Sequence, residues 1–365
     1  MKKILVTFGT RPEAIKMAPL VIELKKSECL DVKVCVSGQH KEMLQQVLDI
    51  FNIEPDYDLE IMKKNQDLFD ITSNILLDFR DVLYDYKPDI VLVHGDTTTA
   101  FSAALASFYE EIPIGHIEAG LRTYNIKSPF PEEFNRQGIG LIADYHFSPT
   151  ESAAKYLIEE KKEKGSIVVT GNTGIDALKY TVRETYSHPE LDWAKGSRLI
   201  LVTAHRRENR GRPLENICRA VLQLVNTFED VKVIYPVHLS PAVRKTVNSL
   251  LADHPSIHLI DPLDVVDFHN FIAASFFVMS DSGGIQEEAP SLGKPVLVLR
   301  DTTERPEGIK AGTLKLVGTD TKDIVKEGTI LLTNKEQYES MSKANNPYGD
   351  GYASARIVQY LKEKL

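Results

Sequence analysis

The feature that most constrains the fold of this chain is a repeated order of strand, turn and helix. Short apolar segments rich in β-branched residues end abruptly in polar or glycine-bearing residues, and an amphipathic helical pattern follows. The predicted strands are residues 4–8, 32–36, 90–93, 112–117 and 145–147 in the first half, and 199–203, 231–235, 257–260, 276–280 and 296–299 in the second. This alternation is typical of α/β proteins, in which helices cover both faces of a parallel sheet.

The pattern stops and starts again near the middle of the chain. A length of 365 residues predicts about two domains, and a charged stretch at 161–165 precedes a hinge-like segment at 170–174. We therefore expect an N-terminal Rossmann-like domain over residues 1–168 and a C-terminal Rossmann-like domain over residues 169–351. A final helix at about 352–365 is expected to pack back on the first domain. Because ligands bind beyond the carboxyl ends of such strands, two doubly wound domains are expected to face a central cleft.

Composition limits the partners of the chain. The sequence is 42% hydrophobic and 26% charged, as in ordinary globular proteins, and its net charge is −9. An acidic chain is poorly suited to nucleic acid or to an anionic membrane surface. No apolar run reaches the length of a membrane span, and the three cysteines lack a C-x-x-C spacing. We expect a cytoplasmic protein with no nucleic-acid partner and no membrane partner.

An anion site is predicted after the apolar segment 276–280. Ser282, Gly283 and Gly284 follow it at the start of a helical pattern. Glycines let a large anion approach the main chain, and the free N–H groups of a helix N-terminus favour phosphate or diphosphate. Glu287 and Glu288 lie in the same helix, where a carboxylate could accept hydrogen bonds from a sugar diol. The alternative is that Ser282 only caps the helix and the glycines only form a turn.

A second polar cluster follows the predicted strand 199–203. His205 beside a diphosphate could donate two hydrogen bonds as imidazolium, or one as the neutral ring, and Arg206 comes next. The alternative is a helix-capping loop with solvated arginines. The chain lacks G-x-G-x-x-G after its first strand and lacks G-x-x-x-x-G-K-[ST], and its histidines have no metal-ligand spacing. We therefore expect no cofactor and no metal.

Three carboxylates stand at or near strand ends in the first half. Asp96, Glu118 and Glu132 are more than a phosphate site requires, and Arg11 and Lys16 follow the first strand. Collected in one cleft, such carboxylates could work as general acid and base, because crowding and burial shift their pKa values apart.

Ion pairing is the structural alternative for these carboxylates. Glu132 or Glu133 could pair with Arg136, and Glu118 could pair with Arg122 at helical spacing. The sequence alone leaves the two interpretations about equally supported.

With these residues in view, the chain resembles the non-hydrolysing UDP-N-acetylglucosamine 2-epimerases from end to end. The matching blocks are residues 9–16, 94–97, 118–123, 131–137, 170–172, 204–209, 281–295 and 301–307. The resemblance implies a fold like the B-type glycosyltransferases, a homodimer, and the conversion of UDP-GlcNAc to UDP-ManNAc without a redox cofactor. It implies elimination of UDP to 2-acetamidoglucal and re-addition, with a product that supplies ManNAc-type sugars for cell-surface polysaccharides.

The resemblance also implies roles for single residues. It makes Asp96, Glu118, Glu132 and His205 the catalytic group. The implied substrate-binding residues are Arg11, Lys16, Phe268, Ser282, Gly283, Gly284, Glu288 and Arg305, and an implied site for an activating second UDP-GlcNAc includes Gln39, Arg206 and His238. Glu42 and Asn65 depart from the activator pattern, in which the relatives carry glutamine and arginine. Losing an arginine and gaining a carboxylate should weaken binding of a dianion there.

Three other functions stay open for the sequence. A hydrolysing relative would release UDP and free N-acetylmannosamine, a glycosyltransferase would need an acceptor, and a nucleotide-sugar sensor would bind without turnover. The three carboxylates argue against the sensor.

Overall fold

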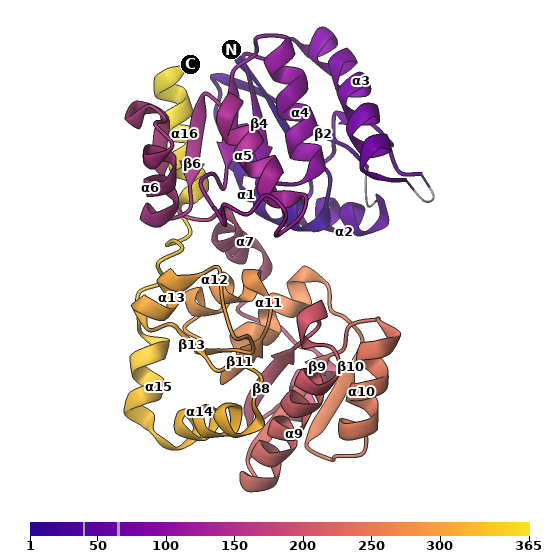
Figure 1. Cartoon of the computed structure of the whole chain (residues 1–365), viewed down its shortest axis with the longest axis vertical. Coiled ribbons are helices and arrows are strands. Elements are labelled where there is room, and N and C mark those ends of the chain that lie inside the picture. Colours follow the sequence, from indigo (N-terminus) through magenta and orange to yellow (C-terminus); the bar gives the residue numbers. More distant parts are fainter. Residues whose placement is uncertain (39–40, 64–65) are drawn as a thin grey trace. The chain divides into compact units, whose positions relative to one another are not determined.

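The computed structural model describes residues 1–38, 41–63 and 66–365, and at residues 41–43 it describes the backbone alone. The chain divides into two compact units (Figure 1). Unit 1 comprises Met1–Lys179 with Tyr348–Leu365, and unit 2 comprises Tyr180–Pro347. Each unit contains one parallel sheet with helices on both faces. This confirms the predicted α/β class with two Rossmann-like halves.

Unit 1 has a seven-stranded sheet in the order β3-β2-β1-β4-β5-β6-β7. Its strands are β1 (Lys2–Phe8), β2 (Leu30–Val36), β3 (Tyr57–Asp58), β4 (Ile90–His94), β5 (Ile114–Ile117), β6 (Tyr145–Ser148) and β7 (Ile167–Val169). Its helices are α1 (Arg11–Lys25), α2 (Lys41–Phe51), α3 (Leu68–Tyr86), α4 (Thr98–Tyr109), α5 (Glu132–Ile142), α6 (Glu151–Glu159), η1 (Lys164–Ser166), α7 (Thr173–Thr181) and α16 (Ala353–Lys364).

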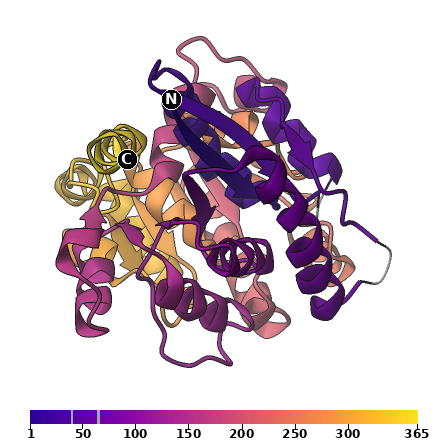
Figure 2. The ribbon, with the colours of Figure 1, turned by 90° about the horizontal axis from the view of Figure 1, so that it is seen from above.

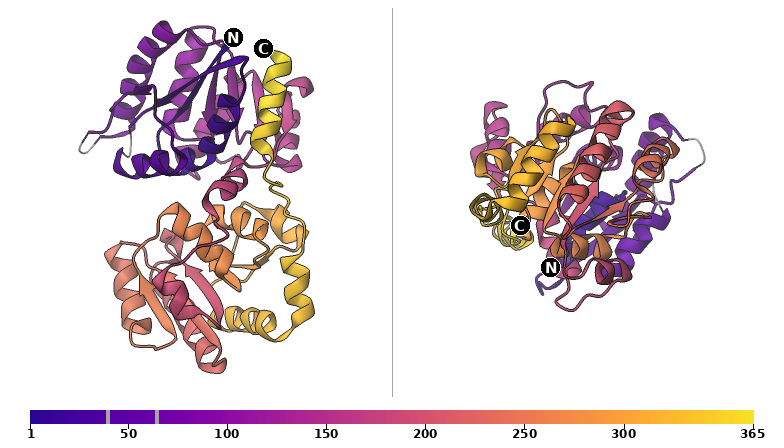
Figure 3. Two further views of the ribbon diagram at one scale, coloured as in Figure 1. Left: turned by 180° about the vertical axis from the view of Figure 1, so that it is seen from behind. Right: turned by 90° about the horizontal axis from the view of Figure 1, so that it is seen from below.

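Alternating residues of β1 show how the sheet of unit 1 is covered. Ile4, Val6 and Phe8 pack in the core that α1, α2 and α16 share, whereas Leu5 packs in the core on the α3, α4 and α5 side. Both faces of a buried parallel strand are apolar, which explains the continuous hydrophobic run in the sequence. Because α16 belongs to the first core, the two chain termini lie close together on unit 1 (Figures 2 and 3).

Unit 2 repeats this architecture with a six-stranded sheet in the order β10-β9-β8-β11-β12-β13. Its strands are β8 (Arg198–Thr203), β9 (Val231–Pro236), β10 (Ile257–Ile260), β11 (Phe277–Ser280), β12 (Val296–Val298) and β13 (Leu314–Leu316). Its helices are α8 (Pro189–Ala194), η2 (Arg207–Asn209), α9 (Arg212–Thr227), α10 (Pro241–Leu251), α11 (Val265–Ala274), α12 (Gly283–Ser291), α13 (Pro306–Ala311), α14 (Thr321–Thr333) and α15 (Lys335–Ser342). Ile200 faces the α9 core, and Leu201 faces the α11 and α12 core.

The strand order reverses once in each sheet. In unit 1 the reversal lies between β1 and β4, and in unit 2 it lies between β8 and β11. At such a point the two following helices leave on opposite faces and open a crevice at the carboxyl ends of the strands. Most of the predicted site residues follow these strands.

The unit boundary differs from the predicted boundary after residue 168. That position falls inside β7, which pairs with β6 and therefore belongs to the first sheet. Ala177 of α7 is also part of the unit 1 core, so the first unit continues to Lys179. At the other end, Asn172 donates its backbone N–H to the carbonyl of Tyr348 at 2.7 Å, and unit 2 ends at Pro347 rather than at residue 351.

Candidate active site

A pocket of about 400 Å³ opens in unit 1 at the carboxyl ends of β1, β4 and β5. Its lining includes Lys16, His94, Asp96, Glu118 and Glu132. The structure therefore brings together all three carboxylates and the lysine that the sequence singled out. Their proximity is a consequence of strand order, because β4 lies between β1 and β5 in the sheet.

The turn after β1 is held by one buried carboxylate. Glu13 accepts hydrogen bonds from the N–H groups of Gly9 at 3.1 Å and Thr10 at 2.8 Å, and from the hydroxyl of Thr97 at 2.6 Å. Thr97 in turn caps α4 by accepting from Ala100 N–H at 3.0 Å. This network fixes the β1–α1 turn against the β4–α4 turn and so sets the floor of the pocket.

Glu118 is held in place by three neighbouring side chains. It follows β5 with a positive φ of 61° and forms an ion pair with Lys16. Lys16 pairs with Glu118 Oε2, and Asn172 Nδ2 donates to the same oxygen at 3.0 Å. His94 Nε2 lies 3.6 Å from this oxygen. Burial raises the pKa of Glu118, but the Lys16 ammonium and the His94 ring outweigh it, so the pKa lies well below its ordinary value. Glu118 is therefore held as the carboxylate.

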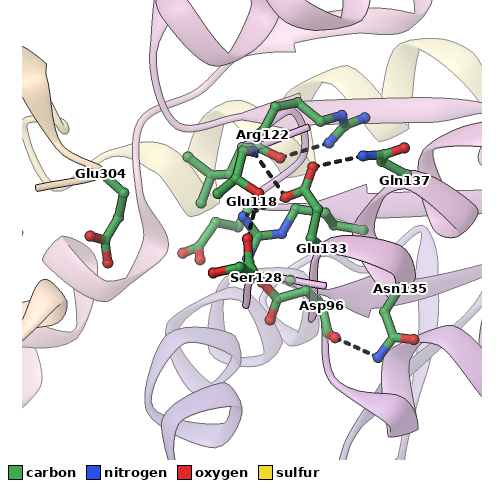
Figure 4. Close-up of polar contacts among 12 residues, drawn as sticks. Asp96, Glu118, Arg122, Ser128, Glu133, Asn135, Gln137 and Glu304 are labelled. Carbon is green, nitrogen blue, oxygen red and sulfur yellow. Dashed lines mark hydrogen bonds and ion pairs between the residues drawn. The ribbon is translucent and has the colours of Figure 1, made fainter. Parts of the chain in front are cut away.

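Asp96 has the opposite perturbation. Asn135 Nδ2 donates to the backbone carbonyl of Asp96 at 2.9 Å (Figure 4). Arg136 Nη2 donates to Asp96 Oδ2 at 2.6 Å. Burial raises the pKa of Asp96, and the nearby charge of Glu118 adds to this, so the lowering effect of Arg136 is outweighed. Two carboxylates with different proton affinities in one pocket are what acid–base chemistry requires.

Glu132 and Glu133 have different surroundings at the start of α5. Glu132 lines the pocket, whereas Glu133 is fully buried and accepts hydrogen bonds from the N–H groups of Thr123 and Tyr124 at 3.0 and 2.9 Å. Gln137 Nε2 donates to Glu133 at 2.7 Å (Figure 4). Burial raises the pKa of Glu133, but these hydrogen bonds outweigh it and lower the pKa. Glu133 is thus a structural residue that orders the segment before α5.

The predicted ion-pair alternatives are found in part. Arg136 Nη1 lies 3.4 Å from Glu133, so that alternative is correct for Glu133. Arg122 forms a bidentate pair with Glu160 at 2.7 and 2.8 Å, which excludes the predicted pairing of Arg122 with Glu118. The helical spacing was misleading because Glu118 and Arg122 lie in the turn after β5, not in a helix.

Two partners of Glu118 were not predicted as site residues. His94 is the last residue of β4 and is buried, and Asn172 comes from the segment before α7. Both stand in sequence blocks that mark the resemblance, but only the folded chain shows that they meet Glu118. Arg11, the first residue of α1, stands between Thr10 and Pro12, which both line the pocket.

The predicted anion site lies in unit 2 at the start of α12. Ser282 occupies the N-cap position, yet its side chain makes no capping hydrogen bond in the described structure. Its backbone N–H donates to Ser280 Oγ at 3.0 Å. A Cβ built on Gly283 would lie 2.6 Å from Arg305 Nη1, so only glycine permits this approach of the guanidinium to the helix start.

Arg305 is held at the start of α12 by two carboxylates. Its Nε donates to Glu287 Oε1 at 2.5 Å, and its Nη1 lies 3.0 Å from Glu304 Oε1. Burial raises the pKa of Glu304, but Arg305 and Arg300 lower it to about 2. Arg305 and Gly283 therefore lie together at the start of α12, and the two carboxylates partly balance the positive charge of Arg305.

Glu288 and Phe268 lie on neighbouring helices of unit 2. Glu288 Oε2 is 3.5 Å from His269 Nε2, and His269 Nδ1 shares a hydrogen bond with Thr181 Oγ1 at 2.7 Å. Phe268 precedes His269 on α11 and packs partly buried against the core of unit 2.

His205 and His238 stack at the ends of β8 and β9. Their rings are 5.4 Å apart with an interplanar angle of 6°, and Arg206 Nη2 lies 3.4 Å from Glu304. Arg206 and His238 are thus close to His205 in unit 2. The other predicted activator residue, Gln39, lies outside the described residues, as do Asn65 and the side chain of Glu42.

Among residues 1–38, 41–63 and 66–365, no three side chains of His, Cys, Asp or Glu are grouped so that they could hold a metal ion. In the same part of the chain, no helix has both the length and the hydropathy needed to cross a membrane.

Comparisons with known proteins agree on one family. A sequence model of the UDP-N-acetylglucosamine 2-epimerase family matches residues 22–362. The UDP-N-acetylglucosamine 2-epimerase of Bacillus subtilis (strain 168) is 60% identical over 359 residues, which cover 98% of this chain and 94% of that protein. The S. aureus MnaA–UDP co-structure has a TM-score of 0.92 at 51% identity and covers 100% of this chain and 97% of the other. The UDP-GlcNAc 2-epimerase of Neisseria meningitidis, bound to UDP-GlcNAc, has a TM-score of 0.90 at 51% identity and covers 99% and 100% of the two chains. The chain therefore belongs to the UDP-N-acetylglucosamine 2-epimerase family.

Proposed function

We propose that this protein interconverts UDP-GlcNAc and UDP-ManNAc without hydrolysis, by eliminating UDP to give 2-acetamidoglucal and adding it back. The observation that carries the proposal is that Asp96, Glu118 and Glu132 line one pocket. The relatives support the substrate, because the Bacillus protein bears the epimerase name and the Neisseria structure contains UDP-GlcNAc.

The chemistry requires groups of different proton affinity. The C2 proton of an N-acetyl sugar is not acidic, so elimination needs a base and a stabilised leaving group. Glu118 is kept ionised by Lys16, whereas the raised pKa of Asp96 makes its carboxylate the stronger base. We therefore assign proton removal at C2 to Asp96. Glu118 and Glu132 remain for the proton exchange on the opposite face of C2.

The residues of unit 2 account for nucleotide binding in this proposal. The N-terminus of α12 with Ser282, Gly283 and Gly284 would bind the diphosphate, as anions bind other helix N-termini. Arg305 would add positive charge, as would His205 when its ring is protonated, and this charge stabilises UDP as a leaving group. By resemblance, Glu288 would accept from the ribose and Phe268 would contact the uracil. The S. aureus relative, solved with UDP, supports a site for this nucleotide.

Incubation with UDP-GlcNAc alone in D2O tests the proposal. We expect deuterium at C2 of both UDP-sugars, together with a constant total of UDP-sugar. Glu54→Gln, an exposed carboxylate variant of unit 1, should exchange as fast as the parent protein. Free UDP that accumulates as substrate disappears would indicate a hydrolysing enzyme, and turnover only after an acceptor is added would indicate a glycosyltransferase.

We also propose a cytoplasmic homodimer whose product supplies polysaccharide synthesis. Sedimentation at several protein concentrations tests the dimer.

An activating second UDP-GlcNAc near Gln39, Arg206 and His238 should bind weakly, because Glu42 and Asn65 replace the side chains expected there. Hyperbolic dependence of the rate on UDP-GlcNAc would agree with this, and a steep sigmoidal dependence would contradict it.

A further inference from the structure

Asp281 follows β11 directly, and its side chain is fully buried in unit 2. Its Oδ2 accepts hydrogen bonds from the backbone N–H groups of His205 and Arg206 and from Asn209 Nδ2, each at 2.9 Å. Asn209 Nδ2 also donates to the carbonyl of Leu299 at 3.0 Å. Oδ2 therefore ties the loop after β8 to the end of β11 and has a complete structural role.

The second oxygen of Asp281 has different surroundings. Although Oδ1 is buried, it has no hydrogen-bond partner within the described part of the chain. His205 Nδ1 lies 3.6 Å from it, which is within ion-pair reach but longer than a hydrogen bond. A buried acceptor without a donor is costly, and catalytic hydrogen bonds are often long before a ligand binds.

We propose that Asp281 is a positioning residue for His205: its Oδ1 accepts from Nδ1–H, and the imidazolium that this favours donates from its outward Nε2–H to an anionic ligand. A carboxylate can only accept, so the neutral ring is held as the Nδ1–H tautomer, whose Nε2 cannot donate. The negative charge of Asp281 also favours imidazolium, the form in which both ring nitrogens donate. The inference rests on the proposed function only for the identity of the anion, a nucleoside diphosphate. The tautomer of His205 does not depend on the proposed function, because His205 and Asp281 both belong to unit 2.

The charges around His205 make Asp281 the decisive neighbour. The ring is 43% exposed, His238 stacks on it, and Arg206 is adjacent in sequence and paired with Glu304. Burial lowers the pKa of His205, and His238 and Arg206 lower it further, so that Asp281 alone of these groups opposes the change. Without the charge of Asp281, imidazolium would form only at lower pH.

The variant Asp281→Asn separates positioning from structure. An asparagine can still present one oxygen to the three donors, but its NH₂ group then faces His205 Nδ1 and can only donate. Because Nδ1 must then accept, the neutral ring of His205 carries its proton on Nε2 in this variant. We would measure the ¹⁵N shifts of labelled histidines in the full chain without ligand, assigning His205 from His205→Asn. The expected result is an Nδ1–H tautomer in the parent protein, and an Nε2–H tautomer with a lower pKa in Asp281→Asn.

Glu190→Gln is the matched control. It removes the negative charge that lies 2.5 Å from His258 in the same unit, and it should leave the His205 signals unchanged. An Nε2–H tautomer for neutral His205 in the parent protein would overturn the inference, even if Asp281→Asn does not fold. An unchanged tautomer in a folded Asp281→Asn would overturn it as well.

Calorimetric binding of UDP across pH provides the functional readout. Asp281→Asn should bind UDP about tenfold more weakly between the two measured His205 pKa values, where only the parent carries imidazolium. Above both values the loss should disappear, and the variant should bind at least as tightly as the parent, because only its neutral ring keeps Nε2–H as a donor. An equal loss at every pH would mean that Asp281 only holds the loop, and would contradict the inference. If the parent protein does not bind UDP, the proposed function fails, while the tautomer still decides the role of Asp281.

Discussion

At the scale of single residues, the pocket of unit 1 shows how neighbours decide proton affinity. Burial raises the pKa of both Asp96 and Glu118. For Glu118 the adjacent Lys16 outweighs burial, while for Asp96 burial outweighs the Arg136 guanidinium 2.6 Å away. The sign of each shift therefore depends on partners that are distant in the sequence.

Removing either carboxylate should affect turnover far more than nucleotide binding. We expect Asp96→Asn and Glu118→Gln to lower kcat by about 100-fold or more, because general acid–base groups contribute at least this much. UDP affinity should stay within several-fold, since the proposed UDP-binding residues are in unit 2. Steady-state kinetics with calorimetry would measure both, with Glu54→Gln as the control. A large loss of UDP affinity would show that these side chains hold the ligand or the fold.

Gly9 is a second residue whose identity is dictated by its neighbours. A Cβ built there would lie 2.0 Å from Ser37 Oγ and 2.5 Å from Thr99 Oγ1. Overpacking of this kind costs about 1–3 kcal/mol, so Gly9→Ala should lower the unfolding free energy of unit 1 by about 2 kcal/mol in urea. Gly165→Ala is the control, because its Cβ would meet only Glu163 Oε1 at 3.7 Å. Equal stability of the two variants would contradict the packing argument.

At the scale of elements, two helix starts with similar sequence signals have different tasks. Thr150 caps α6 by accepting from Ala153 N–H at 3.2 Å, whereas Ser282 makes no such bond to α12 in the described structure. Thr150→Ala should therefore cost about 1 kcal/mol of stability and leave UDP affinity unchanged. Ser282→Ala should weaken UDP binding and leave the unfolding free energy within about 0.5 kcal/mol of the parent. A stability loss in Ser282→Ala equal to that in Thr150→Ala would indicate a plain helix cap.

The sequence predicts the long elements well and the short ones poorly. The strand at 257–260 is predicted with its observed bounds, and the strands at 4–8 and 32–36 lack only their first two residues. The strands β3, β7 and β13 were missed, and all three are edge strands of two or three residues. So short a strand has no readable period, and its pairing depends on the neighbouring strand. The same limit applies to the site, where Glu118 and Asn172 are 54 residues apart in the chain.

At the scale of the whole molecule, the two units differ in their buried histidines. His116 and His146 are register partners on β5 and β6, and both are almost fully buried. Burial lowers the pKa of His116 to about 3 and that of His146 to about 4, against an ordinary value of 6.5. In unit 2 the most buried histidine is His269, which pairs with Glu288. At acidic pH, keeping these buried histidines neutral therefore lowers the unfolding free energy of unit 1 more than that of unit 2.

This difference predicts that unit 1 loses stability first as the pH falls. Below pH 6.5 the unfolded chain binds protons that folded His116 and His146 cannot, so stability is present above pH 6.5 and is lost on acidification. Between pH 7 and pH 5 each histidine should cost unit 1 about 2 kcal/mol. Hydrogen exchange of β5 and β6 amides would report unit 1, and fluorescence of the single tryptophan, Trp193, would report unit 2. His146→Leu should remove about half of the pH dependence in unit 1, whereas His254→Gln in unit 2 should leave it intact. Parallel loss of both units between pH 7 and pH 5, with no effect of His146→Leu, would refute the assignment of this acid sensitivity to the histidine pair.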